Sequence, residues 1–373
     1  MRKLRVLNSD DAERAVAPQD EREGVPPVPA AFGRKGFLPL VDAMGRRYRY
    51  LRLSVTDRCD MACTYCMPHG GETEHAARVE MLSFEEIERL CRVLASMGVQ
   101  KVRLTGGEPL LRKELPRLVQ NLARVEGLRS LYLSSNASRL SVFASALRQA
   151  GLKGVNVSLD SLSPERFSRL TRGGVLSATL DGIRAAIEAG IEVKLNTVLI
   201  ANENEGEAEA IVDFAWSLGV TPRFIELMPL GAGAELAARS LVSNAQLAER
   251  LAASLALNFA PSRSIDDGPA RYLSRADEPE RRVGFISART GNFCDACNRI
   301  RITANGELRT CLGWRKGLSL RDAMRAGASD REIAWAFHWA LSNREDGHVF
   351  DAPRRALAAS VDHHHVGMSL VGG

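Results

Sequence analysis

From about Tyr48 the chain alternates short apolar runs with longer stretches whose apolar residues recur at helical spacing. The short runs predict strands, and the longer stretches predict amphipathic helices. Strands are expected at 50–55, 101–105, 130–135, 154–159, 192–199 and 222–227. Helices are expected at 83–97, 112–124, 138–150, 164–171, 175–189 and 204–218. Strands that alternate with helices form parallel sheets, so the pattern predicts an α/β fold.

The number of strand–helix units is too small for a complete barrel. We therefore predict an incomplete (βα)6 TIM-type barrel over residues 36–242 and a C-terminal α+β region over 243–373. Residues 1–35 lack periodicity, which predicts a flexible N-terminal arm, and 229–243 predict a linker. The C-terminal region should contain strands at 283–287, 299–304 and 307–311, a tight turn at Asn305-Gly306, and helices at 243–254, 318–326 and 329–342.

One face of each predicted barrel strand is polar, although barrel interiors are normally filled by branched apolar side chains. The polar side chains are Arg52 and Ser54; Arg103 and Thr105; Ser134 and Asn136; Asn156, Ser158 and Asp160; Lys194 and Asn196; and Glu226 and Met228. The opposite face, including Ile225 and Leu227 in the sixth strand, is apolar and suits the helices. Arg52, Arg103 and Lys194 would converge if the sheet curls. Because buried charges need partners, we predict that the interior binds a polyanion. The alternative, an antiparallel sheet with one solvated face, is disfavoured by the intervening helices.

Composition supports an ordinary globular enzyme. The 373 residues are 45% hydrophobic and 25% charged, and the net charge of +5 is too small to indicate a nucleic-acid partner. The basic start lacks the apolar segment of a secretory signal, and we see no apolar run that would span a bilayer. We therefore expect a cytoplasmic protein that binds neither nucleic acid nor membrane.

Six of the seven cysteines fall into two groups, which favours reduced, metal-binding thiolates over disulfides. Thiolate ligands suit zinc or an iron–sulfur cluster, and both normally take four ligands. Each group lacks an obvious fourth ligand. One such group does not discriminate between zinc and a cluster, but two incomplete groups favour clusters. The first group is Cys59, Cys63 and Cys66, and the second is Cys294, Cys297 and Cys311. The seventh, Cys91, lies in a predicted helix and is expected to be a buried small hydrophobe.

A glycine pair follows the second strand, in Thr105-Gly-Gly-Glu-Pro109. The glycines permit close backbone approach to a ligand, and Glu108 adds an acceptor. Such a pair alone is more often a simple turn. Its position one strand after the cysteine loop makes a functional role more compelling.

These motifs together resemble the radical S-adenosylmethionine (SAM) superfamily, with an aromatic residue, Tyr65, before the last cysteine of the first group. Longer matches resemble the GTP 3′,8-cyclase family within it, the molybdenum cofactor biosynthesis protein A group. The matching segments run in order along the chain, at 51–57, 101–109, 156–161, 194–198, 223–228, 267–269, 297–301 and Gly372-Gly373.

The resemblance implies a lyase that converts GTP into (8S)-3′,8-cyclo-7,8-dihydroguanosine 5′-triphosphate in the first step of molybdenum cofactor biosynthesis. It implies two [4Fe–4S] clusters, one on each cysteine group, and SAM on the open iron of the first. The positions that match SAM contacts are Tyr65, Gly107, Ser158 and Met228. Those that match GTP contacts are Arg52, Arg103, Ser134, Lys194, Arg299, Ile300 and Arg301.

The resemblance also implies that the tail inserts into the active site, which would give Gly373 a catalytic role. The implied partners are an electron donor and a downstream cyclic pyranopterin monophosphate synthase, and a homodimer is compatible with the sequence. Ala137 stands where the family usually has glycine, so we expect a backbone conformation there that suits a β-carbon. Two alternatives remain: a radical enzyme that modifies a peptide, which would call for more C-terminal cysteines, and a zinc-stabilised binding protein without catalysis.

Overall fold

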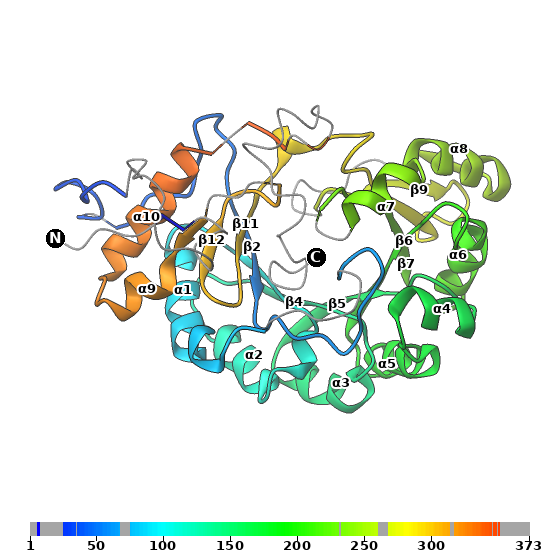
Figure 1. The fold of residues 1–373 in the computed structure, drawn as a ribbon, viewed down its shortest axis with the longest axis horizontal. Helices are drawn as coiled ribbons and strands as arrows, with labels where there is room; N and C mark the ends of the chain where they lie inside the picture. The colour runs from blue at the N-terminus through cyan, green and yellow to red at the C-terminus, as the bar shows by residue number, and fades with distance from the viewer. Residues whose placement is uncertain are drawn as a thin grey trace.

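The computed structural model describes residues 6–7, 25–34, 36–67, 75–230, 233–259, 268–313, 317–344, 346–348 and 350. Its strands form one sheet in the order β1-β13-β12-β11-β2-β3-β4-β5-β6-β7-β10-β9-β8, and helices line the outer side of its curved central part (Figure 1). All six predicted barrel strands are confirmed and pair in parallel. They are β2 Tyr50–Ser54, β3 Lys101–Thr105, β4 Ser130–Ser135, β5 Leu152–Ser158, β6 Glu192–Val198 and β7 Thr221–Ile225.

The predicted barrel helices are also confirmed, with ends that differ by a few residues. They are α1 Phe84–Ser96, α2 Leu115–Ala123, α3 Leu140–Gln149, α4 Pro164–Thr171, α5 Leu176–Glu188 and α6 Ala208–Ser217. Local sequence explains their ends. The Ser83 hydroxyl accepts the amide of Glu86 at 3.2 Å at the start of α1, and Gly98, with φ +94°, follows its end. The predicted incomplete barrel is therefore the observed fold.

The C-terminal strands extend this same sheet from both of its edges. β11 (Arg299–Ile302) pairs in parallel with β2, and β10 (Arg282–Ile286) pairs in parallel with β7. Antiparallel strands continue outward as β12 Glu307–Arg309 and β13 Gly317–Ser319 on one side, and as β9 Arg271–Arg275 and β8 Leu257–Phe259 on the other. β1 (Val6–Leu7) pairs with β13. The predicted Asn305-Gly306 turn joins β11 to β12, with Gly306 at φ +83°.

The prediction of a linker over 229–243 was wrong in part, because α7 (Gly233–Arg239) forms within it. The Gly-Ala composition of this stretch gave no periodic signal, yet Ala237 is buried. The other C-terminal helices are confirmed as α8 Asn244–Leu255, α9 Leu320–Arg325 and α10 Asp330–Ser342.

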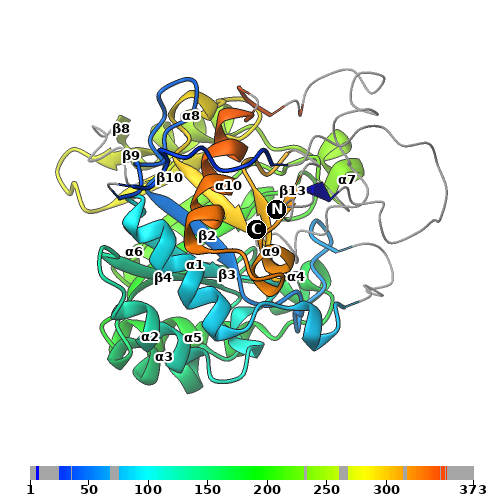
Figure 2. The same ribbon diagram turned by 90° about the vertical axis from the view of Figure 1, so that its left-hand side faces the viewer.

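The end of the predicted flexible arm is docked on α10, so that part of the prediction was wrong. Arg331 donates to the carbonyl oxygens of Phe32 at 2.7 Å and Pro29 at 2.6 Å, and Trp335 donates to that of Pro26 at 2.9 Å. The ring of Phe32 meets that of Trp335 edge-on at 5.2 Å. Figure 2 shows the blue N-terminal segment beside the orange helix. Bonds from side chains to main-chain carbonyls leave no hydrophobic period, which is why the sequence pattern missed them.

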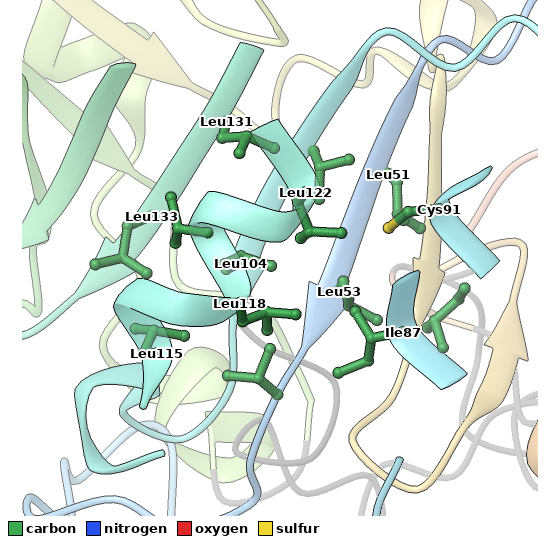
Figure 3. Packing of buried hydrophobic residues seen from close by; sticks show 14 of the residues in the cluster. Leu51, Leu53, Ile87, Cys91, Leu104, Leu115, Leu118, Leu122, Leu131 and Leu133 are labelled. Carbon is green, nitrogen blue, oxygen red and sulfur yellow. The ribbon is translucent and has the colours of Figure 1, made fainter. Parts of the chain in front are cut away.

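The apolar face of the barrel sheet packs against the surrounding helices. Leucines of β2, β3 and β4 meet Ile87 of α1 and Leu118 and Leu122 of α2 (Figure 3). Each fully buried side chain of this kind contributes about 1.5–3 kcal/mol of transfer free energy. Cys91 lies fully buried among them, as predicted. Within the described parts of the chain, no helix is long and apolar enough to cross a membrane.

Candidate active site

The first cysteine group lies on a loop that leaves the carboxyl end of β2. Main-chain bonds from the loop to the end of α4 fix its path: the amide of Ala62 donates to the carbonyl of Thr171 at 3.0 Å, and that of Thr64 to Leu170 at 2.9 Å. Within the loop, the amide of Cys66 donates to the carbonyl of Cys63 at 2.9 Å. The three thiols are thus held at the rim of the barrel where parallel strands end.

The glycine pair after β3 packs against the start of this loop. A β-carbon at Gly107 would lie 2.2 Å from the carbonyl oxygen of Arg58, and one at Gly106 would lie 2.6 Å from that of Thr56. The amide of Gly107 donates to the Thr56 carbonyl at 2.9 Å. The close backbone approach that the glycines allow is therefore made to the chain itself, and it seats the cysteine loop on the neighbouring strand end.

Glu108 and Asp60 link the next strand end to the same loop. The carboxylate of Glu108 accepts the hydroxyl of Ser135 at 2.8 Å and the amide of Asn136 at 2.7 Å. The side chain of Asn136 donates to Asp60 at 2.7 Å, as does the hydroxyl of Ser138. Asp60 lies between Cys59 and Cys63 in the sequence, so the end of β4 helps to orient the cysteines.

Ala137, next in the chain, adopts a left-handed conformation with φ +62° and is fully buried. The expectation of a conformation suited to a β-carbon was wrong, because this region costs a residue with a β-carbon about 1 kcal/mol or more. Gly182 of α5 makes room for it: a β-carbon at Gly182 would lie 2.2 Å from the Ala137 oxygen and 3.1 Å from its β-carbon.

The cysteine loop and the barrel rim enclose a first cavity, and every predicted SAM-contacting position lines it. Tyr65 is fixed there by Asp160, whose carboxylate accepts its hydroxyl at 2.7 Å and the amide of Val198 at 2.9 Å. Burial raises the pKa of Asp160 to about 6 and that of Glu108 to about 7. The predicted residues that line this cavity are Cys59, Cys63, Tyr65, Cys66, Gly107, Ser134, Ser158 and Met228.

The thiols in this cavity need a cation to ionise. Burial raises the pKa of Cys59 to about 12 and that of Cys66 to about 11, so without a positive charge they would remain protonated at neutral pH. Bound metal supplies such a charge and deprotonates its thiol ligands. Among the residues that the structure describes, no three His, Cys, Asp or Glu side chains converge to hold a single metal ion. Three thiolates can each bind a different iron atom of a cluster, so this donor set fits an iron–sulfur cluster.

Deeper in the barrel, three arginines lie in direct register on adjacent strands. Arg301 of β11 pairs with Arg52 of β2, which pairs with Arg103 of β3. The next row places Arg299 beside Tyr50 and Tyr50 beside Lys101. Neighbouring strands are roughly 4.8 Å apart, and like charges directly opposite each other repel. These two rows create a concentrated positive field inside the sheet.

The positive field shifts the pKa values of the side chains in these two rows. Burial would raise the pKa of Tyr50, but the charges of Arg103, Arg52 and Lys101 outweigh it and lower the pKa to about 7. Burial and the charge of Arg299 lower the pKa of Arg301 to about 10. Burial and Arg301 also lower that of Arg52. A bound polyanion would relieve this repulsion, as the polar strand faces predicted.

The same cations line a second cavity together with the second cysteine group. Cys294 lies in a short 3-10 helix (Cys294–Ala296), Cys297 follows it, and Cys311 lies just after β12. The two cavities adjoin, because Ser134, Asn196, Ile225 and Met228 line both. The predicted residues of the second cavity are Arg52, Arg103, Ser134, Met228, Cys294, Cys297, Arg299, Arg301 and Cys311.

Three predicted site residues lie elsewhere or outside the described structure. Lys194 does not line either cavity and instead forms an ion pair with Glu192 at 2.8 Å. The side chain of Ile300 is fully buried in the hydrophobic core, on the face opposite to Arg299 and Arg301, so only its backbone is available to a ligand. Gly373 falls outside the described residues.

The face assigned to the sixth barrel strand was also wrong. Ile225 lines both cavities, whereas it was expected to face the helices. Arg223 shares its face, lines the second cavity and donates to Asn196 at 2.7 Å. The strand ends at Ile225, so alternation counted back from Glu226 and Met228 does not apply to it. Had the count been restricted to the strand, Arg223 would have been found.

Sequence reasoning missed two further residues of the second cavity. Lys101 lies over the rings of Tyr50 at 5.1 Å and Tyr132 at 4.5 Å. The hydroxyl of Tyr50 accepts the Nε of Arg103 at 2.5 Å. Both positions share the polar face of Arg52 and Arg103, and strict alternation by two from those arginines would have identified them.

Comparison with known proteins agrees with this geometry. The family model of the Radical SAM superfamily matches residues 53–215, and the model described as Molybdenum Cofactor Synthesis C matches residues 220–350. The GTP 3′,8-cyclases of Rhodopseudomonas palustris (strain TIE-1) and Paracoccus denitrificans (strain Pd 1222) are each 41% identical over 338 residues, which covers 90% of this chain and 96% of the relative. That of Brucella canis is 41% identical over 341 residues, with the same coverage.

The open parallel barrel with three thiols at its rim defines a radical SAM protein, a class that uses SAM with an iron–sulfur cluster. Nearly the whole chain aligns with relatives of one kind. The chain belongs to the GTP 3′,8-cyclase family.

Proposed function

We propose that this chain is a GTP 3′,8-cyclase, a lyase that forms (8S)-3′,8-cyclo-7,8-dihydroguanosine 5′-triphosphate for molybdenum cofactor biosynthesis. The observation that carries the proposal is the pair of adjoining cavities. One is lined by three thiols, and the other by in-register arginines and three further thiols. A substrate that spans their shared wall would present its anionic end to the arginines and its middle to the first cavity.

The two cysteine groups would each hold a [4Fe–4S] cluster. Cys59, Cys63 and Cys66 would bind the first, with Tyr65, Gly107, Ser158 and Met228 around SAM. Cys294, Cys297 and Cys311 would bind the second. When bound, the first cluster and SAM would supply the chemistry that removes a hydrogen atom from C3′ of GTP. The protein holds the groups in place and excludes water from the cavity.

The chain's own cations would orient GTP. Arg52, Arg103 and Arg301, in register on three strands, would anchor the triphosphate, since guanidinium groups suit bidentate phosphate contacts. Arg299 and the second cysteine group would lie toward the guanine. With both ends fixed, the ribose faces the first cavity, where C3′ and C8 can be joined. Lys194 would contact GTP only by releasing Glu192, its ion-pair partner, and binding a phosphate oxygen instead.

The remaining expectations belong to this proposal. Gly373 would act in the active site as part of the C-terminal tail of the chain. Ser134 would contact GTP from the wall shared by both cavities, and Ile300 would contact GTP through its backbone. An electron donor and a cyclic pyranopterin monophosphate synthase would act before and after the reaction, in the cytoplasm.

The test is nucleotide dependence. Anaerobically reconstituted and reduced protein is incubated with SAM and each nucleoside triphosphate, and 5′-deoxyadenosine is measured. We expect its formation to require GTP and to be absent in a Cys59→Ser variant. Formation that does not depend on GTP would contradict the cyclase assignment. A colourless reconstituted protein with stoichiometric zinc would instead support a zinc-stabilised binding protein.

A further inference from the structure

A buried polar cluster borders the second cavity and has no part in the function described so far. Its members are Asp42, Arg46, Tyr48 and Arg344, and each is at most 9% exposed. Three of them precede β2 in the sequence, and the fourth follows α10. Buried charges are retained only where they are paired and hydrogen-bonded. The question is what these bonds hold in place.

Asp42 organises a tight turn and binds one edge of the Arg46 guanidinium. Gly45, at φ +76°, allows the chain to reverse. One carboxylate oxygen of Asp42 accepts the amides of Met44 at 3.0 Å and Arg46 at 2.9 Å. The other accepts the Nε of Arg46 at 2.5 Å and the hydroxyl of Tyr48 at 2.7 Å. With the carboxylate engaged on Nε, the far edge of the Arg46 guanidinium is directed elsewhere.

That far edge bridges two segments that are distant in sequence. The Nη1 of Arg46 donates to the carbonyl of Cys294 at 3.0 Å and to that of Asp346 at 2.8 Å. The carbonyl of Cys294 belongs to a cysteine of the second group. The carbonyl of Asp346 begins a segment that packs on the same cysteine, since a β-carbon at Gly347 would lie 3.5 Å from the sulfur of Cys294.

The cluster also reaches the cavity wall. Arg344 lines the second cavity, donates to the hydroxyl of Tyr48 and lies 5.2 Å from its ring. Because its guanidinium contacts the carbonyl of Cys294, Arg46 also places a positive charge beside this cysteine. A purely structural ion pair would hold the turn to the sheet without bonding both to the carbonyl of one particular cysteine and to the segment that packs on its sulfur.

We propose that Arg46 is a positioning residue for the second iron–sulfur cluster, holding both the peptide of Cys294 and the 346–348 segment that packs against its sulfur. The proposal rests on the proposed function, because it needs a cluster on Cys294, Cys297 and Cys311. Partners of metal ligands commonly alter metal affinity on the order of tenfold or more. Hydrogen bonds to the sulfurs and nearby charge also set the reduction potential of a cluster.

The experiment isolates the second cluster in the full-length chain by replacing Cys59, Cys63 and Cys66 with serine. In that background, Arg46→Met and Arg46→Lys are compared with Arg46 intact. Arg47→Met is the matched control, because Arg47 is the next residue and its side chain is exposed. Iron content, the rate of iron loss to a chelator and the midpoint potential by spectroscopic redox titration are measured, together with thermal unfolding.

In Arg46→Met we expect iron loss on the order of tenfold faster and a more negative potential, because both the bridging bonds and a positive charge are lost. Arg46→Lys keeps the charge but not the forked contacts, so its potential should stay near that of the parent while iron loss accelerates. Arg47→Met should match the parent. If Arg46→Met does not fold, Arg46→Lys decides alone.

Unchanged iron loss in a folded Arg46→Lys variant, and unchanged iron loss and potential in a folded Arg46→Met variant, would overturn the positioning role. A parent background with Arg46 intact that fails to bind about four iron atoms per chain would instead contradict the two-cluster function itself. The two failures are therefore distinguishable.

Discussion

At the residue scale, the ionisation of Tyr50 reports on the positive charge in the second cavity. Its hydroxyl accepts Arg103, and its ring lies beside Lys101. The cations outweigh burial and lower its pKa to about 7 from the ordinary value of 10.0. Because the folded-state pKa is the lower one, ionisation of Tyr50 stabilises the ligand-free protein above pH 7. That contribution is complete only above the unfolded-state value and is lost as the pH falls through about 7.

We expect one tyrosine of the ligand-free protein to titrate near pH 7, as measured by the ultraviolet absorbance of tyrosinate, and its pKa to rise when GTP binds. A bound triphosphate neutralises the arginine field and so removes the cause of the shift. Tyr50→Phe, the matched control, should abolish the signal near neutrality. A titration that is the same with and without GTP would place the anion away from Tyr50.

The residues of the site were predictable to the extent that alternation along a strand was reliable. Arg52 and Arg103 were expected to converge, and they do, in register. Lys194 was expected to join them, but it pairs instead with Glu192, which lies two positions earlier on the same face. Tyr50 escaped notice because an aromatic side chain reads as apolar although its hydroxyl accepts a hydrogen bond from Arg103.

At the element scale, the packing of α3 on α5 depends on a glycine in a helix. Gly182→Ala would normally favour a helix by about 1 kcal/mol. Here a β-carbon would lie 2.2 Å from the oxygen of Ala137 and 3.1 Å from the β-carbon of Leu140. Backbone cannot yield cheaply, so we expect a loss of about 1–3 kcal/mol in the free energy of unfolding.

Chemical denaturation measures this effect, with Ser177→Ala as the control because Ser177 is an exposed residue of the same helix. The control should change the free energy of unfolding by less than about 0.5 kcal/mol. A Gly182→Ala protein as stable as the parent would show that Ala137 is free to relax away from the left-handed conformation.

Length alone did not decide which elements were predicted, since the three-residue β12 was found and the five-residue β9 was missed. The barrel strands and helices carry enough residues for a period to be recognised, and they were found. Strands β8 and β13 have three residues each, and four of the seven residues of α7 are Gly or Ala, so none of these elements shows a clear period. Their conformations are set by the neighbours they pair with, which local sequence does not contain.

At the scale of the whole molecule, the site is assembled from both ends of the chain. Arg301 in the C-terminal region lies beside Arg52 in the first barrel strand, because β11 adds to the free edge of β2. The sequence predicted a separate C-terminal region, since strand pairing across such a separation has no local signal. The consequence is a sheet whose folding brings like charges together, which costs free energy that a bound anion would recover.

This repulsion leads to a prediction for Arg52→Gln in which the stability of the ligand-free protein and the stabilisation by GTP respond differently. Arg52 lies in the middle of the row, so Arg52→Gln removes a charge that faces Arg301 on one side and Arg103 on the other. We expect the ligand-free protein to melt at the same temperature as the parent or higher, because repulsion falls. Saturating GTP, which should stabilise the parent by about 2.7 kcal/mol at a hundred times its Kd, should stabilise the variant much less. If calorimetry shows that Arg52→Gln lowers both the stability of the ligand-free protein and the stabilisation by GTP, Arg52 supports the fold rather than the anion. Arg58→Gln, at an exposed position nearby in the sequence, controls for the change of net charge.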